Sequence, residues 1–358
     1  MDMKIVLLSI VKPAAGSGDG TTEYVYQLRK QLEGKAEIEV LYSLDSVKRN
    51  NVRGLIATNT VFKDKIKELA ASDCDIVHIT SQELGFSAKI LKEGKSTAKI
   101  ITTIHDLTRF EKVYHRGFVQ QAYNALVTKS IIDSVIYSDG LIFDGKQTLE
   151  DTVRLMGKIP GMTRVVTLGV KENILETPVG RKRRKVFTIG YIGALATHKN
   201  VSLLLKAAKL LKGKGSFRFV IYGTGVENVS LLKYKEANGL NNVEFMGFAP
   251  EEETPRIYDS FDAFVFPSLY EGFGLPILEA QARGLPVIIN ENGKITPEVR
   301  RYCFKVNDEK GLAKLIVKLQ KEGYLGKDKI RAMKYARSFT WEKTAEGTLN
   351  MYRKMLSR

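Results

Sequence analysis

The sequence of 358 residues has only two cysteines, Cys74 and Cys303, which lie far apart and outside any CxxC pattern. This argues against a thiol redox centre or a zinc site and favours a reducing compartment with two inert core thiols. No apolar run approaches the roughly 20 residues of a membrane-spanning helix. The apolar run within residues 1–10 is too short and lacks a signal-peptide layout, so we interpret it as a buried first strand.

Repeats, heptads and low-complexity tracts are also absent. The contents of 44% hydrophobic and 27% charged residues are ordinary for a soluble globular chain and exclude wholesale disorder and collagen-like or disulfide-scaffold classes. A chain of this length is too long for one compact core, so two domains are expected.

The net charge of +16 is distributed unevenly along the chain. Residues 1–180 contain 24 Lys and Arg against 22 Asp and Glu, a net +2, whereas residues 181–358 contain 32 against 18, a net +14. A basic second half could hold a nucleotide diphosphate, touch an anionic membrane or nucleic acid, or be a solvated surface. Because no basic stretch is interleaved with aromatic residues, we expect no nucleic-acid partner.

Short apolar stretches alternate with helical patterns in two series. The first predicts strands at 4–10, 38–43, 74–80, 98–106 and 140–145, with helices at 22–32, 63–72 and 117–136. The second predicts strands at 186–193, 217–223, 243–248, 263–268 and 286–290, with a helix at 201–213. Strands and helices that alternate at this spacing predict parallel sheets with helices on both faces.

These two series predict an α/β protein with two Rossmann-like, doubly wound domains that face a cleft. The first domain is expected over residues 1–180 and the second over 181–340. Between them, the basic run at 181–185 is interpreted as a linker, with a membrane or polyanion contact as the alternative. The amphipathic segment 341–358, which contains the single tryptophan, Trp341, is expected to be a helix with a packing role on the first domain.

The most informative segment is PSLYEGFGLPILE, residues 267–279. A strand is expected to end at Pro267 and a helix to begin near Pro276, because proline suits the first helical turn. The backbone amides of Phe273, Gly274 and Leu275 would then converge at a helix N-terminus, which favours a bound phosphate. Two glutamates, Glu271 and Glu279, lie eight residues apart in the same segment.

This segment resembles the E-x7-E signature of the retaining glycosyltransferases of family 4 (glycosyl transferase group 1), which have the GT-B fold. The similarity continues through EAQARGLPVI at 279–288 and TPEV at 296–299. The resemblance implies that Glu271 lies beside the donor sugar and diphosphate, and that Glu279 holds the nucleotide ribose. A carboxylate that accepts two ribose hydroxyl hydrogen bonds is consistent with that role.

The second half opens with GYIGALATHKN, residues 190–200, which resembles the donor loop of the same family. Lys199 and Asn200 match that loop, and Gly193 lies in it, whereas Ala194 stands where an arginine is usual. Half of the cationic pair expected at the diphosphate is therefore missing, and His198 or a residue from elsewhere would compensate. By the same resemblance, Gly223 and Gly225 form a turn beside the nucleotide, and Gly247, Phe248 and Ala249 offer backbone contacts to the base. Taken alone, such glycine turns are weak signals.

The first half has fewer signals. The loop GSGDGT at 16–21 does not have the GxGxxG spacing of a dinucleotide site, and the resemblance implies that Gly18, Asp19 and Gly20 contact the acceptor. His105 and Asp106 end a predicted strand and match an HD pair that lies near the reacting sugar and the acceptor in the family. The alternative is a capping Asp beside an incidental His. His78 is interpreted as structural, and GKS at 94–96 is rejected as a Walker motif because position 89 is Lys.

The resemblance implies an enzyme of the hexosyltransferase type (EC 2.4) that transfers a sugar from a nucleotide-diphosphate sugar, UDP- or GDP-linked, with retention of configuration. His105, Glu271 and Lys199 are the expected catalytic residues. No cofactor and no metal are expected, since no Asp-x-Asp pair is placed to serve a donor diphosphate. The acceptor, a lipid-linked compound, a saccharide or a small molecule, remains open.

We expect the protein in the cytoplasm, either free or in peripheral contact with the membrane through basic stretches. Two alternatives stay open at this stage: a nucleotide-sugar 2-epimerase, and a non-catalytic protein that binds a sugar or nucleotide. For retention, same-face attack is favoured over a covalent intermediate, because no carboxylate nucleophile is evident beside His105 in the sequence.

Overall fold

The computed structural model describes residues 3–12, 20–44, 62–110, 118–159, 161–176, 185–324 and 326–357. The chain divides into two compact units: the first comprises Met1–Gly169 and Trp341–Arg358, and the second comprises Val170–Thr340. The division falls before the predicted boundary at residue 180, because residues 170–176 are bonded to the second unit. Val170 N donates to Phe339 O at 3.0 Å, and Arg283 donates to the carbonyl of Glu176.

The described part of the first unit contains one six-stranded parallel sheet with the order β2-β1-β3-β4-β5-β6. Its strands are β1 Lys4–Val11, β2 Glu37–Leu44, β3 Ile76–Ile79, β4 Lys99–Ile104, β5 Gly140–Phe143 and β6 Met162–Val165. Its helices are α1 Gly20–Leu32, a helix over residues 62–70, η1 Gln82–Leu84, α3 Phe86–Glu93, η2 Thr108–Phe110, α4 Phe118–Tyr137, α5 Lys146–Met156 and α13 Trp341–Leu356.

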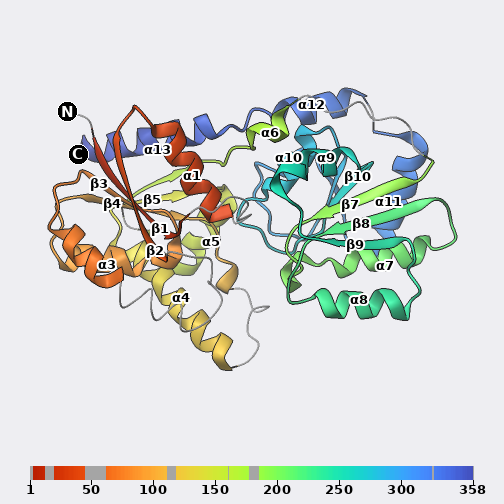
Figure 1. The fold of residues 1–358 in the computed structure, drawn as a ribbon, viewed down its shortest axis with the longest axis horizontal. Coiled ribbons are helices and arrows are strands. Elements are labelled where there is room, and N and C mark those ends of the chain that lie inside the picture. The colour runs from red at the N-terminus through yellow and green to blue at the C-terminus, as the bar shows by residue number, and fades with distance from the viewer. Residues whose placement is uncertain are drawn as a thin grey trace. The chain divides into compact units, whose positions relative to one another are not determined.

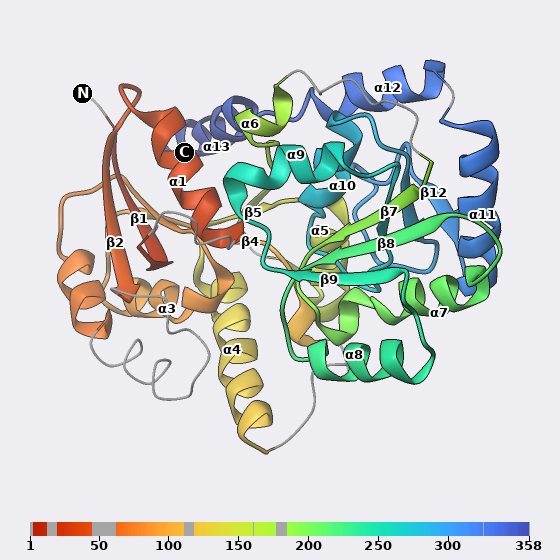
Figure 2. The same ribbon diagram turned by 45° about the vertical axis from the view of Figure 1, so that its right-hand side comes forward.

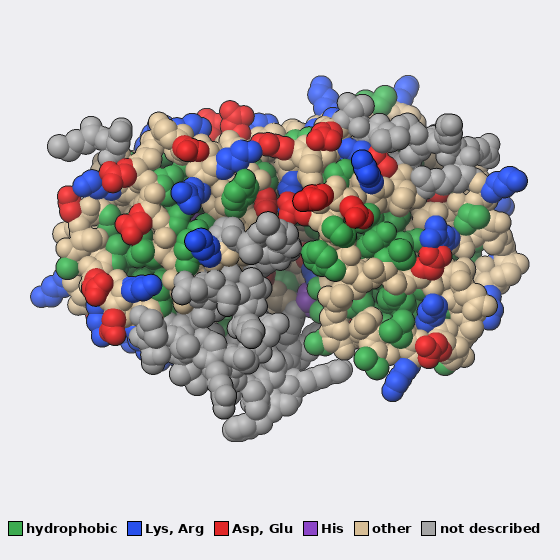
Figure 3. All heavy atoms as spheres, viewed as in Figure 1, with side chains coloured by type: hydrophobic (Ala, Val, Ile, Leu, Met, Phe, Trp, Pro, Cys, Tyr) green, Lys and Arg blue, Asp and Glu red, His purple; other side chains and the backbone are tan. Residues whose placement is uncertain are grey.

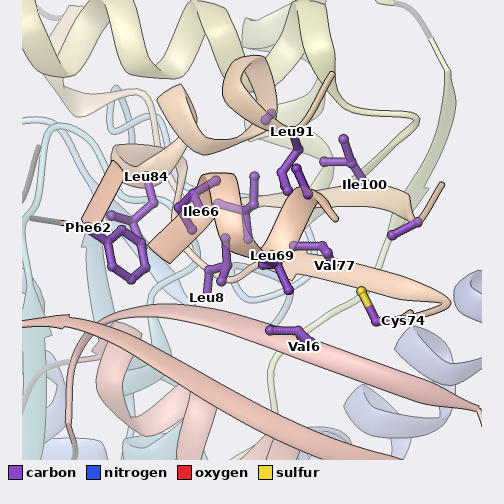
Figure 4. Packing of buried hydrophobic residues seen from close by; sticks show 14 of the residues in the cluster. Val6, Leu8, Phe62, Ile66, Leu69, Cys74, Val77, Leu84, Leu91 and Ile100 are labelled. Carbon is purple, nitrogen blue, oxygen red and sulfur yellow. The ribbon is translucent and has the colours of Figure 1, made fainter. Parts of the chain in front are cut away.

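Helices cover this sheet on both faces, as the alternating pattern predicts. On one face, strands β1 and β3 pack against α3 and the helix over 62–70 in a buried cluster that includes Leu8, Ile66, Val77 and Leu91 (Figure 4). On the other face, α1 and α13 lie side by side (Figures 1 and 2). Trp341 is buried in α13, and its ring contacts that of Tyr24 on α1.

A buried polar network joins the sheet to α13. The imidazole of His78 on β3 hydrogen-bonds the Tyr352 hydroxyl at 2.6 Å through Nδ1 and the Thr103 hydroxyl at 2.7 Å through Nε2. Burial lowers the pKa of His78 to about 3, so the ring is neutral at physiological pH. Both of its nitrogens are satisfied inside the core, which is the structural role expected from the sequence.

The described part of the second unit contains a six-stranded parallel sheet with the order β12-β11-β10-β7-β8-β9. Its strands are β7 Phe187–Ile192, β8 Phe217–Tyr222, β9 Val243–Gly247, β10 Ala263–Phe266, β11 Val287–Asn290 and β12 Phe304–Val306. Its helices are α6 Glu172–Leu175, η4 Thr197–Lys199, α7 Ser202–Leu211, α8 Asn228–Ala237, η5 Glu251–Glu253, α9 Thr254–Asp259, α10 Leu275–Ala282, α11 Glu309–Glu322 and α12 Gly326–Ala336.

Numbered from its own first strand, the second sheet has the doubly wound Rossmann order 3-2-1-4-5-6, read from its β9 edge. Helix α7 packs against α8 and α11, and α10 packs against α6 and α12. The strand order reverses between β7 and β10, which are neighbours in the sheet but separated by two strands in sequence. In open α/β sheets, ligands bind outside the carboxyl ends of the strands at such a reversal.

Both cysteines are free, and their lack of reactivity stays a prediction. Cys74 lies in the core cluster of the first unit, and burial raises the pKa of the Cys303 thiol to about 12. Among the described residues, no helix combines the length and the hydrophobicity that a membrane span requires. Basic and acidic side chains are interspersed on the face shown in Figure 3.

Candidate functional site

The loops that follow β7 and β10 are bonded to each other at the reversal point of the second sheet. Leu269 N donates to His198 O at 2.7 Å, and Asn200 Nδ2 donates to Pro267 O at 3.4 Å. Asn200 adopts a left-handed backbone with φ of 51°, a conformation that asparagine tolerates well. Hydrogen bonds therefore join the two sequence motifs, 190–200 and 267–279, side by side at one place in the second unit.

An ion pair links these two loops. The Lys199 ammonium donates to both carboxylate oxygens of Glu271 at 2.7 Å, and the two side chains are 17% and 10% exposed. Lys199 Nζ also lies 5.6 Å from the centre of the Phe266 ring. The structure thus brings together two residues that are 72 positions apart and that were predicted to act at one site.

A third loop supports the position of Glu271. Glu271 N donates to Lys294 O at 2.9 Å, and Lys294 N donates to Leu269 O at 2.9 Å. Tyr270 and Lys294 form a parallel β-bridge, so the segment after β11 continues the sheet beside the E-x7-E loop. This backbone pairing holds Glu271 in place without a further side chain.

Helix α10 begins at this loop, as predicted. Its N-cap is Gly274, with φ of 98°, a region that strongly favours glycine, and Pro276 lies in its first turn. Gly274 has no side chain that could accept a hydrogen bond from the amides of the first helical turn. Helix N-termini carry partial positive charge, so the amides near Phe273, Gly274 and Leu275 suit a phosphate.

The second glutamate of the motif lies one turn into α10. Glu279 is half-buried, and its Oε2 accepts a hydrogen bond of 2.8 Å from the Tyr258 hydroxyl on α9. Tyr258 was not predicted as a site residue. It lies outside every motif in the sequence, so no local pattern indicated this contact.

Three glycines predicted at the donor site are packed closely together. A Cβ atom at Gly223 would lie 1.9 Å from the Gly193 carbonyl oxygen, and one at Gly225 would lie 2.4 Å from the Leu195 carbonyl oxygen. Gly193 N donates to Tyr222 O at 3.0 Å. These contacts require glycine at both positions in the 223–225 turn, and they place that turn against the loop after β7.

Beyond this turn lies an exposed aromatic ring. Phe248, which follows β9, is 56% exposed, and Gly223 N donates to the carbonyl of the preceding Gly247 at 2.6 Å. The backbone contact to a base that the resemblance implies for this segment stays a prediction.

In the first unit, His105 follows β4 and is enclosed by acceptors. Its Nδ1 lies 2.7 Å from Oδ2 of Asp144, and its Nε2 lies 2.8 Å from the Thr80 carbonyl oxygen, to which it can only donate. Burial lowers the pKa of His105, but the charge and hydrogen bond of Asp144 outweigh burial and raise it to about 9. The ring is thus held as an imidazolium.

Asp144 is a residue that the sequence analysis missed. Its place at the end of β5, in the segment GLIFDG, was the signal, because neighbouring parallel strands end at the same edge of a sheet. A carboxylate therefore does lie beside His105, contrary to the sequence-based expectation. With a side chain only 3% exposed and one oxygen bonded to His105, it is enclosed rather than available as a nucleophile.

Asp106 caps the short helix η2. Its Oδ1 accepts from Thr108 N at 2.9 Å and from the Thr108 hydroxyl. Gln82 fixes both residues of the HD pair, accepting from His105 N and donating to Asp106 O. The capping alternative thus describes the contacts that Asp106 makes, and its role toward an acceptor stays a prediction.

The remaining acceptor residues are only partly described. Gly20 is the first residue of α1, whereas Gly18 and Asp19 lie outside the described residues. Most of the basic run at 181–185 also lies outside them. Among the residues that are described, no cluster of three or more His, Cys, Asp or Glu side chains could hold a metal ion.

Comparison with known proteins identifies the family that the second unit matches. Residues 175–339, which contain both motifs, match the family of glycosyl transferases group 1. The chain is 32% identical over 171 residues to the O-antigen chain mannosyltransferase B of Escherichia coli. The aligned segment covers 46% of this chain and 45% of that relative. The chain thus matches less than half the length of this relative.

Two further similarities extend along the chain. A UDP-Gal:alpha-D-GlcNAc-diphosphoundecaprenol alpha-1,3-galactosyltransferase of Escherichia coli is 29% identical over 294 residues, which is 75% of this chain and 73% of that one. The structure of a sucrose-phosphate synthase from Thermosynechococcus elongatus superposes with a TM-score of 0.79 at 19% identity and covers 99% of both chains. The chain has the GT-B fold, and its residues 175–339 match the glycosyl transferases group 1 family.

Proposed function

We propose that this protein is a retaining hexosyltransferase that transfers a sugar from a nucleotide-diphosphate sugar to a saccharide, lipid-linked or small-molecule acceptor. The observation that carries the proposal is the Lys199–Glu271 pair beside the N-terminus of α10, at the strand-order reversal of the second unit. This arrangement provides a cation, a row of backbone amides and a carboxylate in one place.

Each part has a function in the proposed reaction. The amides of Phe273, Gly274 and Leu275 and the Lys199 ammonium would stabilise the diphosphate as it leaves, because preorganised donors lower the energy of developing charge. Glu271 would lie beside the sugar, Glu279 would accept the ribose hydroxyls, and Phe248 would contact the base. Gly193, Asn200, Gly223 and Gly225 would shape the loops around the nucleotide.

The first unit is proposed to bind the acceptor near His105, Asp106 and the segment that includes Gly18, Asp19 and Gly20. His105, as a buried imidazolium, would present fixed positive charge and could not act as a base while Nε2 donates to Thr80. Because the carboxylate beside it is enclosed, we favour same-face attack over a covalent intermediate for retention. Asp144 would then be a positioning residue for His105.

Similarity supports the class of donor and acceptor. The relative named for UDP-Gal and a diphosphoundecaprenol acceptor supports a UDP-linked donor and a lipid-linked acceptor for this chain, and the mannosyltransferase supports a hexose as the transferred group. A GDP-linked donor is the alternative. Both relatives are named transferases, which favours transfer over 2-epimerisation. A cytoplasmic location, with peripheral contact to an anionic membrane, is part of the proposal and is tested by liposome sedimentation at low and high salt.

The test is ligand-induced stabilisation followed by an assay of turnover. UDP, GDP and their hexose conjugates should raise the melting temperature of the wild type, since a ligand that binds the native state stabilises it. Lys199→Ala should reduce that shift. Incubation with the stabilising donor and lipid-linked or saccharide acceptors, with and without EDTA, should then give a glycoside in both conditions.

Each alternative has a distinct outcome. A changed free nucleotide sugar without a glycoside would identify an epimerase. Donor binding without turnover on any acceptor would favour a non-catalytic binding protein. Loss of product with EDTA would contradict the metal-independent part of the proposal, and no stabilisation by any nucleotide would contradict the donor site.

A further inference from the structure

Tyr258 contributes a buried hydroxyl group to the site in the second unit. The residue lies on α9 and is 0% exposed, and its hydroxyl donates to Glu279 Oε2 on α10 at 2.8 Å. The two helices lie side by side (Figures 1 and 2). A tyrosine hydroxyl in an apolar core requires a partner, and here the partner is a half-buried carboxylate.

The position of this hydroxyl is fixed by the packing of its ring. The Tyr258 ring makes edge contacts with Phe261 and Phe264, at centroid distances of 6.4 and 5.4 Å. Burial and the neighbouring Glu279 charge raise the pKa of Tyr258 well above its ordinary value of 10. The phenol therefore stays protonated, and its hydrogen bond to the carboxylate persists across the physiological pH range.

The next residue fixes the helix that carries Tyr258. Asp259 pairs with the buried Arg283 guanidinium through both of its carboxylate oxygens. Arg283 lies one turn after Glu279, and its backbone N donates to Glu279 O at 3.0 Å. Tyr258 and Asp259, consecutive residues at the end of α9, thus contact Glu279 within α10 and Arg283 directly after it. Helix α9 therefore cannot shift along α10 without breaking a buried ion pair.

From these contacts we propose that Tyr258 is a positioning residue that orients the Glu279 carboxylate toward the ribose of a bound nucleotide. The proposal rests on the donor site proposed above. A carboxylate oxygen has two acceptor sites, so Oε2 can hold the tyrosine hydroxyl and still accept from a ribose hydroxyl. Anchoring one oxygen also removes rotamers that the glutamate would otherwise lose on binding.

The test is isothermal calorimetry with full-length Tyr258→Phe, a change that removes only the hydroxyl. UDP, GDP and ADP are titrated into the wild type, and the tightest binder is paired with its 2′,3′-dideoxy form. We expect Tyr258→Phe to weaken the normal nucleotide about three- to tenfold. The dideoxy form should bind both proteins equally, because it lacks the hydroxyls that Glu279 would accept.

A merely structural role predicts a different result. If loss of the hydroxyl displaced α10 as a whole, the diphosphate contacts would weaken as well, and both nucleotides would lose affinity by the same factor. That outcome, or unchanged binding of the normal nucleotide, would overturn the proposal. Tyr352→Phe in the first unit, which loses a buried hydroxyl bond to His78, is the matched control and should bind both nucleotides like the wild type.

Glu279→Gln separates failure of this inference from failure of the donor site. If Glu279→Gln weakens the normal nucleotide and Tyr258→Phe does not, only the positioning role is wrong. If Glu279→Gln binds as tightly as the wild type, or if no nucleotide binds, the ribose assignment is wrong and the positioning role fails with it. Should Tyr258→Phe not fold, Asp259→Asn, which weakens the ion pair that holds α9 against Arg283 and leaves Glu279 itself unchanged, gives the same comparison between the two nucleotides.

Discussion

Lys199 and Glu271 pair through both carboxylate oxygens at 2.7 Å, although 72 residues separate them in the chain. The pair is mostly buried, so neither charge is fully hydrated. In the proposed reaction, a donor diphosphate would compete with Glu271 for the Lys199 ammonium. The carboxylate would therefore hold the cation in position at the proposed nucleotide site before the donor binds.

This pair should contribute to stability as well as to binding. Lys199→Met leaves the Glu271 carboxylate enclosed without its cation and should reduce the free energy of unfolding by about 1–3 kcal/mol. Adding Glu271→Gln should restore part of that loss. The control is Arg218→Met, which breaks the exposed Arg218–Glu244 pair and should cost less than about 1 kcal/mol. Unfolding free energies are measured by urea denaturation. Equal losses at the two pairs would contradict the expectation that burial makes the Lys199–Glu271 pair the more important one for stability.

Substitution of the two glutamates of the motif should change different kinetic constants. In Glu279→Gln, an amide group replaces one of the two carboxylate oxygens proposed to accept from ribose. Loss of a charged hydrogen bond costs about 1.5–3 kcal/mol. The donor KM should therefore rise about tenfold or more, with little change in kcat. Glu271→Gln should lower kcat more than it raises KM, because Glu271 is proposed to lie beside the sugar. Steady-state kinetics with the cognate donor tests both. Two variants with wild-type kinetics would contradict the transferase assignment.

Gly223 should tolerate no side chain. Its φ is 150°, and a Cβ atom would lie 1.9 Å from the Gly193 carbonyl oxygen, so Gly223→Ala must displace the loop after β7. We expect a loss of about 2 kcal/mol or more in unfolding free energy, with weaker nucleotide binding. Gly326→Ala, where no atom lies within 4 Å of the added methyl group, is the control. A stable Gly223→Ala variant with normal nucleotide affinity would contradict this packing.

The pair of His105 and Asp144 predicts a pH-dependent stability. The pKa of His105 is raised from 6.5 to about 9, so the folded state binds the proton more tightly than the unfolded state. The resulting stabilisation, up to about 3 kcal/mol, should be complete below pH 6.5 and be lost as the pH rises through 9. Unfolding free energies of wild type and His105→Gln between pH 6 and 10 test this. Parallel curves would show that His105 is not held as an imidazolium.

The hydroxyl of Tyr352 should matter for folding rather than for nucleotide binding. In Tyr352→Phe, Nδ1 of the buried His78 loses its partner, which should cost about 1–3 kcal/mol. Thermal melting measures the loss. An unchanged melting temperature would show that this buried bond does not stabilise the first unit.

The parallel sheets and the loop at the start of α10 could be predicted from local sequence. Apolar stretches that alternate with helical patterns give the parallel sheets, because a strand buried on both faces must be apolar along its length. The order of glycine, proline and glutamate at 271–279 specifies a tight loop and a helix start, because Gly274 must adopt a positive φ and Pro276 suits the first turn. These features depend on residues close together in the chain, so pattern alone reveals them.

The contacts between distant segments were decided only by the tertiary structure. The strand order makes β7 and β10 neighbours and so pairs Lys199 with Glu271, and parallel β4 and β5 bring Asp144 to His105. Tyr258 reaches Glu279 because the Asp259–Arg283 pair aligns two helices. None of these pairings has a local signature, since each depends on the order of strands and on helix packing rather than on spacing along the chain.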